Sequence, residues 1–148
     1  MEYTLKDIVI LDDVVAAIRR NPVFYGGEPP RGARLAAALA RDLIEFGDLP
    51  VSVDFLDGWW IVACDKDWLA GEGRSVYWSR IIPTPEVARE SMRSEVLLTA
   101  SSKGLLTIAA RKVQWIVKGP EIPEPLEHLI KQKAHVGFQG RIAAFTVD

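Results

Sequence analysis

The dipeptide Asp57-Gly58 constrains this chain more than any other feature of its sequence, because it separates two apolar runs, residues 51–56 and 59–64. Asp-Gly favours a two-residue type I′ turn, in which both central residues need φ > 0. A β-hairpin is therefore predicted, and the turn fixes its register. The predicted cross-strand pairs, which make one face of the hairpin entirely apolar, are Phe55 with Trp60, Val53 with Val62 and Val51 with Cys64.

The segment before the hairpin, residues 31–46, has the composition and periodicity of an amphipathic helix. Gly47 is expected to end it. Asp42 projects from the same side as the apolar residues, toward the predicted sheet. A carboxylate in that place either accepts hydrogen bonds from a neighbouring loop or helix end, or lines a cavity. The apolar stripe of this helix consists of Leu35, Leu39, Leu43 and Phe46.

The rest of the chain alternates between extended and helical patterns. The predicted elements are a strand or arm at residues 3–11, a helix from an Asp12 cap to Arg20, an extended segment at 75–82, a helix from Thr84 to about Ser101 with Arg93 facing water, a hairpin at 105–110 and 113–118, a helix at 126–133 and a strand at 141–147. Together they predict one α+β domain over residues 1–148. We expect a two-layer α/β sandwich with a mixed, mainly antiparallel sheet and helices on one face.

Composition and charge narrow the function classes. The chain has 148 residues, 49% of them hydrophobic and 26% charged, which is typical of one globular domain. A net charge of −2 gives no overall attraction to nucleic acid or anionic lipid, so neither partner is expected. No apolar run approaches the roughly 18 residues that cross a bilayer. The default location is the cytoplasm, and the single cysteine, Cys64, is interpreted as a small buried hydrophobe.

Few residues suggest a metal or a cofactor. His128 and His135 lack a nearby cysteine or placed carboxylate, so no metal site is predicted. No cofactor is expected. Trp59 and Trp60 are adjacent and must point to opposite faces of their strand. Trp60 belongs to the apolar face. We therefore expect Trp59 in a secondary layer, a groove or an interface, and the chain to bind a protein partner or itself as a homodimer.

Three segments in the first half of the chain carry a family resemblance. Residues 17–27 resemble the helix-to-loop segment that opens the ATPase domain of the DNA gyrase B subunit. Residues 41–47 resemble the ATP-binding helix of the wider GHKL family, which includes histidine kinases. The hairpin ending at residues 62–67 occupies the place of the strand that leads into the Asp-x-Gly motif of this family. The resemblance implies a GHKL-like fold.

The departures from the family pattern argue against the ATPase. By this resemblance Phe46 stands where an Asn coordinates Mg²⁺, and an aromatic ring offers a metal no oxygen. Asp42 matches the catalytic Glu, and Asp65 matches the carboxylate that receives the adenine amino group. Asp67 replaces the glycine of the motif. The only candidate for the phosphate-binding lid is the short run at residues 71–73, which is more typical of a turn.

Two hypotheses of different classes follow. The first, which we favour, is a non-catalytic binding or assembly module on a GHKL-like scaffold with a lost ATP site. The alternative is a nucleotide-binding protein or ATPase that uses Asp42 and Asp65 around a pocket between helix and sheet.

Overall fold

The hairpin predicted at Asp57-Gly58 forms in the computed structural model, which describes residues 13–20, 31–47, 49–71, 73–84 and 92–147. It joins β1 (Val51–Leu56) to β2 (Trp59–Cys64). Asp57 and Gly58 have φ of 51° and 85°, as a type I′ turn requires. The register is confirmed by the pairs Val51 with Cys64, Val53 with Val62 and Phe55 with Trp60.

A second hairpin and a final strand complete the sheet. The hairpin joins β3 (Gly104–Ala109) to β4 (Lys112–Val117), and the final strand is β5 (Arg141–Thr146). The five strands lie in the order β1-β2-β5-β3-β4, and every neighbouring pair is antiparallel. The strand that comes last in the sequence therefore lies at the centre, between the two hairpins.

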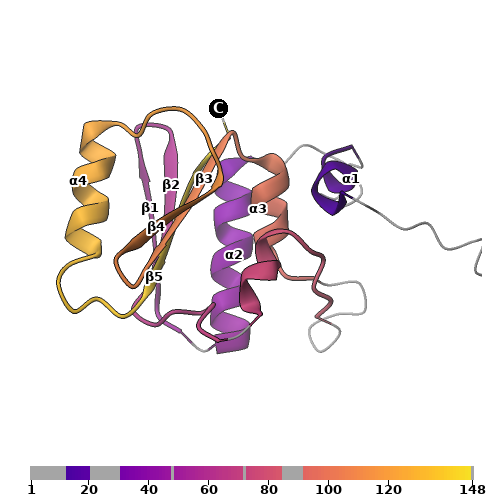
Figure 1. Cartoon of the computed structure of the whole chain (residues 1–148), viewed down its shortest axis with the longest axis horizontal. Helices are drawn as coiled ribbons and strands as arrows, with labels where there is room; N and C mark the ends of the chain where they lie inside the picture. The colour runs from indigo at the N-terminus through magenta and orange to yellow at the C-terminus, as the bar shows by residue number, and fades with distance from the viewer. Residues whose placement is uncertain (1–12, 21–30, 48, 72, 85–91, 148) are drawn as a thin grey trace, which may run out of the picture.

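Helices cover both faces of this sheet (Figure 1). On one face lie α2 (Gly32–Gly47) and α3 (Glu95–Ser101), and on the other lies α4 (Glu124–Lys133). The α+β sandwich is confirmed, but α4 occupies the face where the sequence analysis expected no helix. The strand residues on this second face are also apolar, and α4 buries them, including the fully buried Ile61, Leu106 and Ile142.

Helix α2 packs on the first hairpin through its predicted apolar stripe. Leu35, Leu39 and Leu43 are at most 2% exposed. At the start of the helix, a Cβ on Gly32 would come within 2.3 Å of Trp60 Nε1. The glycine therefore lets α2 approach the hairpin closely.

Two segments between the hairpins differ from the prediction. The segment predicted as extended contains a short 3₁₀-helix, η3 (Arg74–Trp78). The helix predicted from Thr84 to about Ser101 is seen from Glu95 onward, as α3, whereas residues 85–91 of that prediction lie outside the described residues. Before it, Met92 forms an antiparallel bridge with Pro83, and the Arg93 N–H donates to the Ile82 carbonyl at 2.9 Å. This pairing places Met92 and Arg93 before the helix, and Ser94 is its N-cap residue.

At the N-terminus, α1 (Val14–Arg20) packs against α3. Its first turn is capped by Asp13, whose Oδ1 accepts a hydrogen bond from the Ala16 N–H at 3.0 Å. The predicted cap, Asp12, lies outside the described residues, as do the predicted strand at residues 3–11 and the loop at 21–30. In the described part of the chain, no helix has the length and apolar character to cross a bilayer.

Candidate ligand-binding cleft

A buried ion pair lies where α2 meets the start of α3. Arg93 is 7% exposed and pairs with Glu95, which is 0% exposed. Arg93 Nε donates to Glu95 Oε2 at 3.2 Å, and Nη2 donates to Oε1. The guanidinium carbon also lies 5.2 Å from the ring centre of Phe46 and 5.3 Å from that of Tyr77. The ion pair and these cation–π contacts hold Arg93 between the end of α2 and η3.

Asp42 adds a second carboxylate to this cluster. It is 2% exposed, and its Oδ2 accepts a hydrogen bond from the Ser94 backbone N–H at 2.7 Å. Because Ser94 is the residue before α3, Asp42 is bonded to a helix end, which is one of the two roles predicted for it.

Burial raises the pKa values of both carboxylates in this cluster. It raises the pKa of Asp42 above the ordinary value, although the hydrogen bonds from Ser94 and the charge of Arg93 oppose the rise. Burial also raises the pKa of Glu95, against the hydrogen bonds and charge of Arg93. The guanidinium of Arg93 therefore compensates both carboxylates, and the charge of Arg41 adds to this effect at Asp42.

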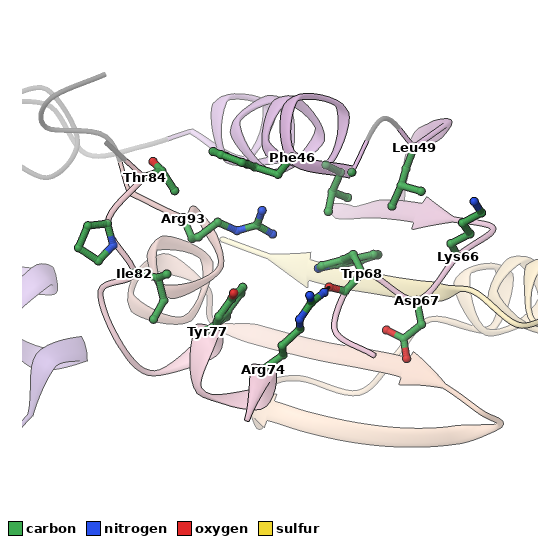
Figure 2. A pocket seen from close by; sticks show the side chains of 13 residues that line it. Phe46, Leu49, Lys66, Asp67, Trp68, Arg74, Tyr77, Ile82, Thr84 and Arg93 are labelled. Atoms are coloured by element: carbon green, nitrogen blue, oxygen red, sulfur yellow. Dashed lines mark hydrogen bonds between the residues drawn. The ribbon is translucent and has the colours of Figure 1, made fainter. Parts of the chain in front are cut away.

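A cleft of about 420 Å³ opens beside the cluster (Figure 2). This volume lies within the range of small-molecule sites, about 300–1,000 Å³. Its walls come from the end of α2, the loop after β2, η3 and the bridged segment before α3. The side chains that give the cleft its chemical character are the aromatic residues Phe46, Trp68 and Tyr77 and the cationic residues Lys66, Arg74 and Arg93.

Trp68 brings an unpaired polar atom to this wall. The residue is 6% exposed, and its buried Nε1 has no hydrogen-bond partner among the described residues. Figure 2 shows the nitrogen end of the ring turned into the cleft, toward the space between Arg93 and Tyr77. A buried N–H without an acceptor costs about 1–3 kcal/mol. An acceptor atom placed in the cleft would remove this cost.

The loop that carries Trp68 is held in place by hydrogen bonds. The Trp68 carbonyl accepts from Arg74 Nη1 at 3.2 Å, and the Leu69 N–H donates to Asp67 Oδ1 at 3.0 Å. Arg141 on β5 binds the same carboxylate, with its Nε 2.6 Å from Asp67 Oδ1. These hydrogen bonds fix the backbone of the loop from which the indole ring projects.

The mouth of the cleft carries positive charge. Lys66 and Arg74 are exposed there. Asp67 supplies the only carboxylate among the described lining residues, and it is paired with Arg141. The charge of Asp67 is thus compensated from β5, which leaves the two cations at the mouth available to an anion.

Asp42 and Asp65, the pair of the nucleotide hypothesis, border no common cavity in the part of the chain that the structure describes. Asp42 is buried behind the cleft wall, and Asp65 is exposed beside a separate cavity of about 340 Å³. Phe46, at the position of the family's metal ligand, does line the cleft, where it covers Arg93. Asp67, at the position of the motif glycine, lines it too.

Trp59 occupies the secondary layer, one of the three locations predicted for it. It is 3% exposed under α4, with its ring centre 6.4 Å from that of Trp115. Buried in this way, it presents almost no surface to a partner. Cys64 is buried as interpreted, and burial together with the neighbouring Asp65 raises the pKa of its thiol to about 11. Within the described residues, no group of three or more His, Cys, Asp or Glu side chains could hold a metal ion.

Sequence reasoning misses Trp68 and Arg74 and misplaces Arg93. The predicted long helix placed Arg93 in water, and this prediction is wrong because the helix starts two residues later. Trp68 carried one usable signal, since it follows the polar run Asp65-Lys66-Asp67 at the end of an apolar strand. A large aromatic residue at such a point often closes the end of a core.

Comparison with known proteins adds no relative. No protein-family model, no curated protein and no solved structure matches the chain.

Proposed function

We propose that this chain is a non-catalytic binding module whose cleft takes a small ligand with a flat apolar group and an anionic group. The observation that carries the proposal is the buried, unpaired Trp68 Nε1 in the cleft wall. An acceptor atom of the ligand would bond to it, the flat group would lie against Phe46 and Tyr77, and the anionic group would approach Lys66 and Arg74.

The proposal includes no catalytic step because the carboxylates in and near the cleft already have hydrogen-bond partners within the protein. Asp42 is bonded to Ser94 and Glu95 to Arg93, and neither lines the cleft. Asp67, the carboxylate that does line it among the described residues, is bound by Arg141. A general base needs a free lone pair within reach of its substrate, and these groups are already occupied.

The GHKL-like scaffold remains part of the proposal as its structural frame. The cleft lies at the end of α2 beside Phe46, where the resemblance places the metal ligand of the family. In this view, a ring and a buried arginine fill space that a nucleotide with its Mg²⁺ would need. The alternative, a nucleotide-binding protein using Asp42 and Asp65, is tested by the same experiment.

The test follows the indole N–H signals of ¹⁵N-labelled protein by NMR, with Trp68→Phe assigning the Trp68 peak. Three matched probes separate the contributions: phenyl phosphate carries both groups, phenol only the ring, and inorganic phosphate only the anion. We expect phenyl phosphate to move the Trp68 peak and to bind at least about tenfold more tightly than either fragment. The ³¹P spectrum should show it unhydrolysed.

Two variants locate the anionic group. Lys66→Gln should weaken phenyl phosphate binding about tenfold, because it removes a charge-assisted contact at the cleft without touching the Arg74 hydrogen bond that holds the Trp68 loop. Lys131→Gln, on the exposed side of α4, is the control and should leave binding unchanged. A Trp68 peak that none of the probes moves would contradict the proposal. Binding of ATP with Mg²⁺ that Asp65→Ala abolishes would support the alternative instead.

A further inference from the structure

The two edges of the sheet differ in how they are protected. At one edge, β4 carries a register shift opposite Leu105 and Leu106, and bulges of this kind discourage pairing with another chain. At the other edge, β1 pairs with β2 in unbroken register over its whole length. The outer side of β1 meets no strand among the described residues. Its hydrogen-bonding groups are a template for a further strand.

Apolar side chains surround this open edge. On the α2 face of the sheet, Val53 is 44% exposed and Phe55 is 57% exposed. Phe55 is held against Trp60, with 4.6 Å between ring centres, so it offers a fixed surface. Ile44 on α2 is 55% exposed and projects on the opposite side of the helix from Asp42, which faces α3. In a single chain, about half of the surface of each of these residues is exposed to water.

The hairpin geometry decides which register a second strand can take. With a two-residue turn, the flanking pair Leu56 and Trp59 is hydrogen-bonded. By alternation, the free N–H and C=O groups of β1 that point outward are those of Val51, Val53 and Phe55. Two copies related by a twofold axis at Val53 would pair these residues in antiparallel order and form about six hydrogen bonds.

Charge complementarity favours this register. Lys133 Nζ lies 3.0 Å from Asp54 Oδ2 and 3.3 Å from Ser52 Oγ, all on the α4 face of the strand. An axis at Val53 places Ser52 and its neighbouring Lys133 opposite Asp54 of the second copy. An axis at Asp54 would instead place the two Asp54 carboxylates opposite each other, which is unfavourable.

We infer that the outer edge of β1 is a homodimer interface, in which two copies of this chain pair antiparallel about Val53 and join their sheets into one. The apolar side chains of Val53, Phe55 and Ile44 are then covered on the α2 face, while Asp54 meets Ser52 and Lys133 on the α4 face. Val53, Phe55 and Ile44 do not line the cleft, and the interface does not depend on the proposed ligand.

Cysteine crosslinking tests the register directly. In a Cys64→Ala background, Val53→Cys leaves one thiol per chain, and the axis brings the two copies of it together with Cα atoms about 5.5 Å apart, within disulfide range. Mild oxidation should give a covalent dimer in high yield. Val113→Cys in the same background is the matched control, because Val113 is 59% exposed on the other edge strand. It should stay monomeric in denaturing gels.

Sedimentation equilibrium over a range of concentrations supplies a second measurement. Wild type should dimerise, and Val53→Lys should raise the dimer dissociation constant by more than about tenfold, because two lysines would face each other. Val113→Lys should not change it. A wild type that is monomeric at every concentration, or a dimer that survives Val53→Lys while Val53→Cys fails to crosslink, would overturn the inference.

Discussion

At the scale of single residues, the cluster of Asp42, Arg93 and Glu95 links α2 to α3 by charge inside the protein. Removing one partner of a buried ion pair commonly costs about 3–5 kcal/mol, because the other charge is left uncompensated. Asp42 has a different role from Glu95, since its main partner is the backbone N–H of Ser94. Its contribution to stability can therefore be separated from its charge.

The effect of the Asp42 charge on stability should appear as a pH-dependent difference in the free energy of unfolding between wild type and Asp42→Asn. Burial raises the pKa of Asp42 above its ordinary value of 3.8, so the folded state holds this proton more tightly than the unfolded state does. The stabilising effect of protonation is complete below 3.8 and is lost as pH rises through the raised value. Asn keeps an acceptor for Ser94 and never ionises. Wild type should thus lose free energy of unfolding relative to Asp42→Asn as the pH rises above 3.8, measured by urea denaturation at a series of pH values.

Asp42→Ala is the control for the hydrogen bond. It leaves the Ser94 N–H buried without an acceptor, and should cost about 1–3 kcal/mol across the pH range. If the stability difference between wild type and Asp42→Asn is independent of pH, Asp42 does not titrate as its burial requires.

The sequence identified Asp42 as unusual but could not supply its partner. A carboxylate on an apolar helical stripe is a local pattern, which periodicity detects. Ser94 lies 52 residues further along the chain, and nothing near Asp42 points to it. The cleft was missed for the same reason, because the end of α2, Trp68 and Arg93 come together only in the folded chain.

At the scale of elements, the second hairpin turns through residues that do not favour its geometry. Ala110 and Arg111 have φ of 50° and 62°, which costs residues other than Gly and Asn about 1 kcal/mol or more. The pair Ala110→Asn and Arg111→Gly supplies the Asn-Gly sequence preferred in type I′ turns. It should stabilise the protein by about 1 kcal/mol, or roughly 2–4 °C in melting temperature by calorimetry. Gly58→Ala, in the first hairpin, should change the melting temperature in the opposite direction.

The first hairpin was predictable from its turn residues and the second from strand alternation, because both patterns act over a few residues. The start of α3 was not. Residues 84–101 have helical periodicity, yet Met92 is bridged to Pro83 and the Arg93 N–H donates to the Ile82 carbonyl, so Met92 and Arg93 precede the helix. In this position before the helix, the Arg93 side chain contacts Glu95 and the rings of Phe46 and Tyr77. Tertiary contacts here outweigh local propensity, which is a weak determinant of structure.

At the scale of the whole molecule, the position of β5 makes the fold depend on its final strand. Ile142, Ala143, Ala144 and Phe145 are 0% exposed, because β5 is paired on both edges and covered on both faces. Its side chains belong to both core clusters, the one beside α2 and α3 on one face and the one beside α4 on the other. Without β5, the two hairpins share no strand and each exposes an unpaired edge.

A chain ending at Gly140 should therefore show no cooperative thermal unfolding, and adding a synthetic peptide of residues 141–147 should restore a transition. The apolar surface that α2 buries against the β-hairpin of β1 and β2 is too small by itself to offset the conformational entropy of folding. Val136→Ser, at a position that is 83% exposed just before β5, is the matched control and should melt like wild type. Circular dichroism on heating measures all of these. A truncated chain that melts cooperatively near the wild-type temperature would show that the hairpins form stable units without the central strand.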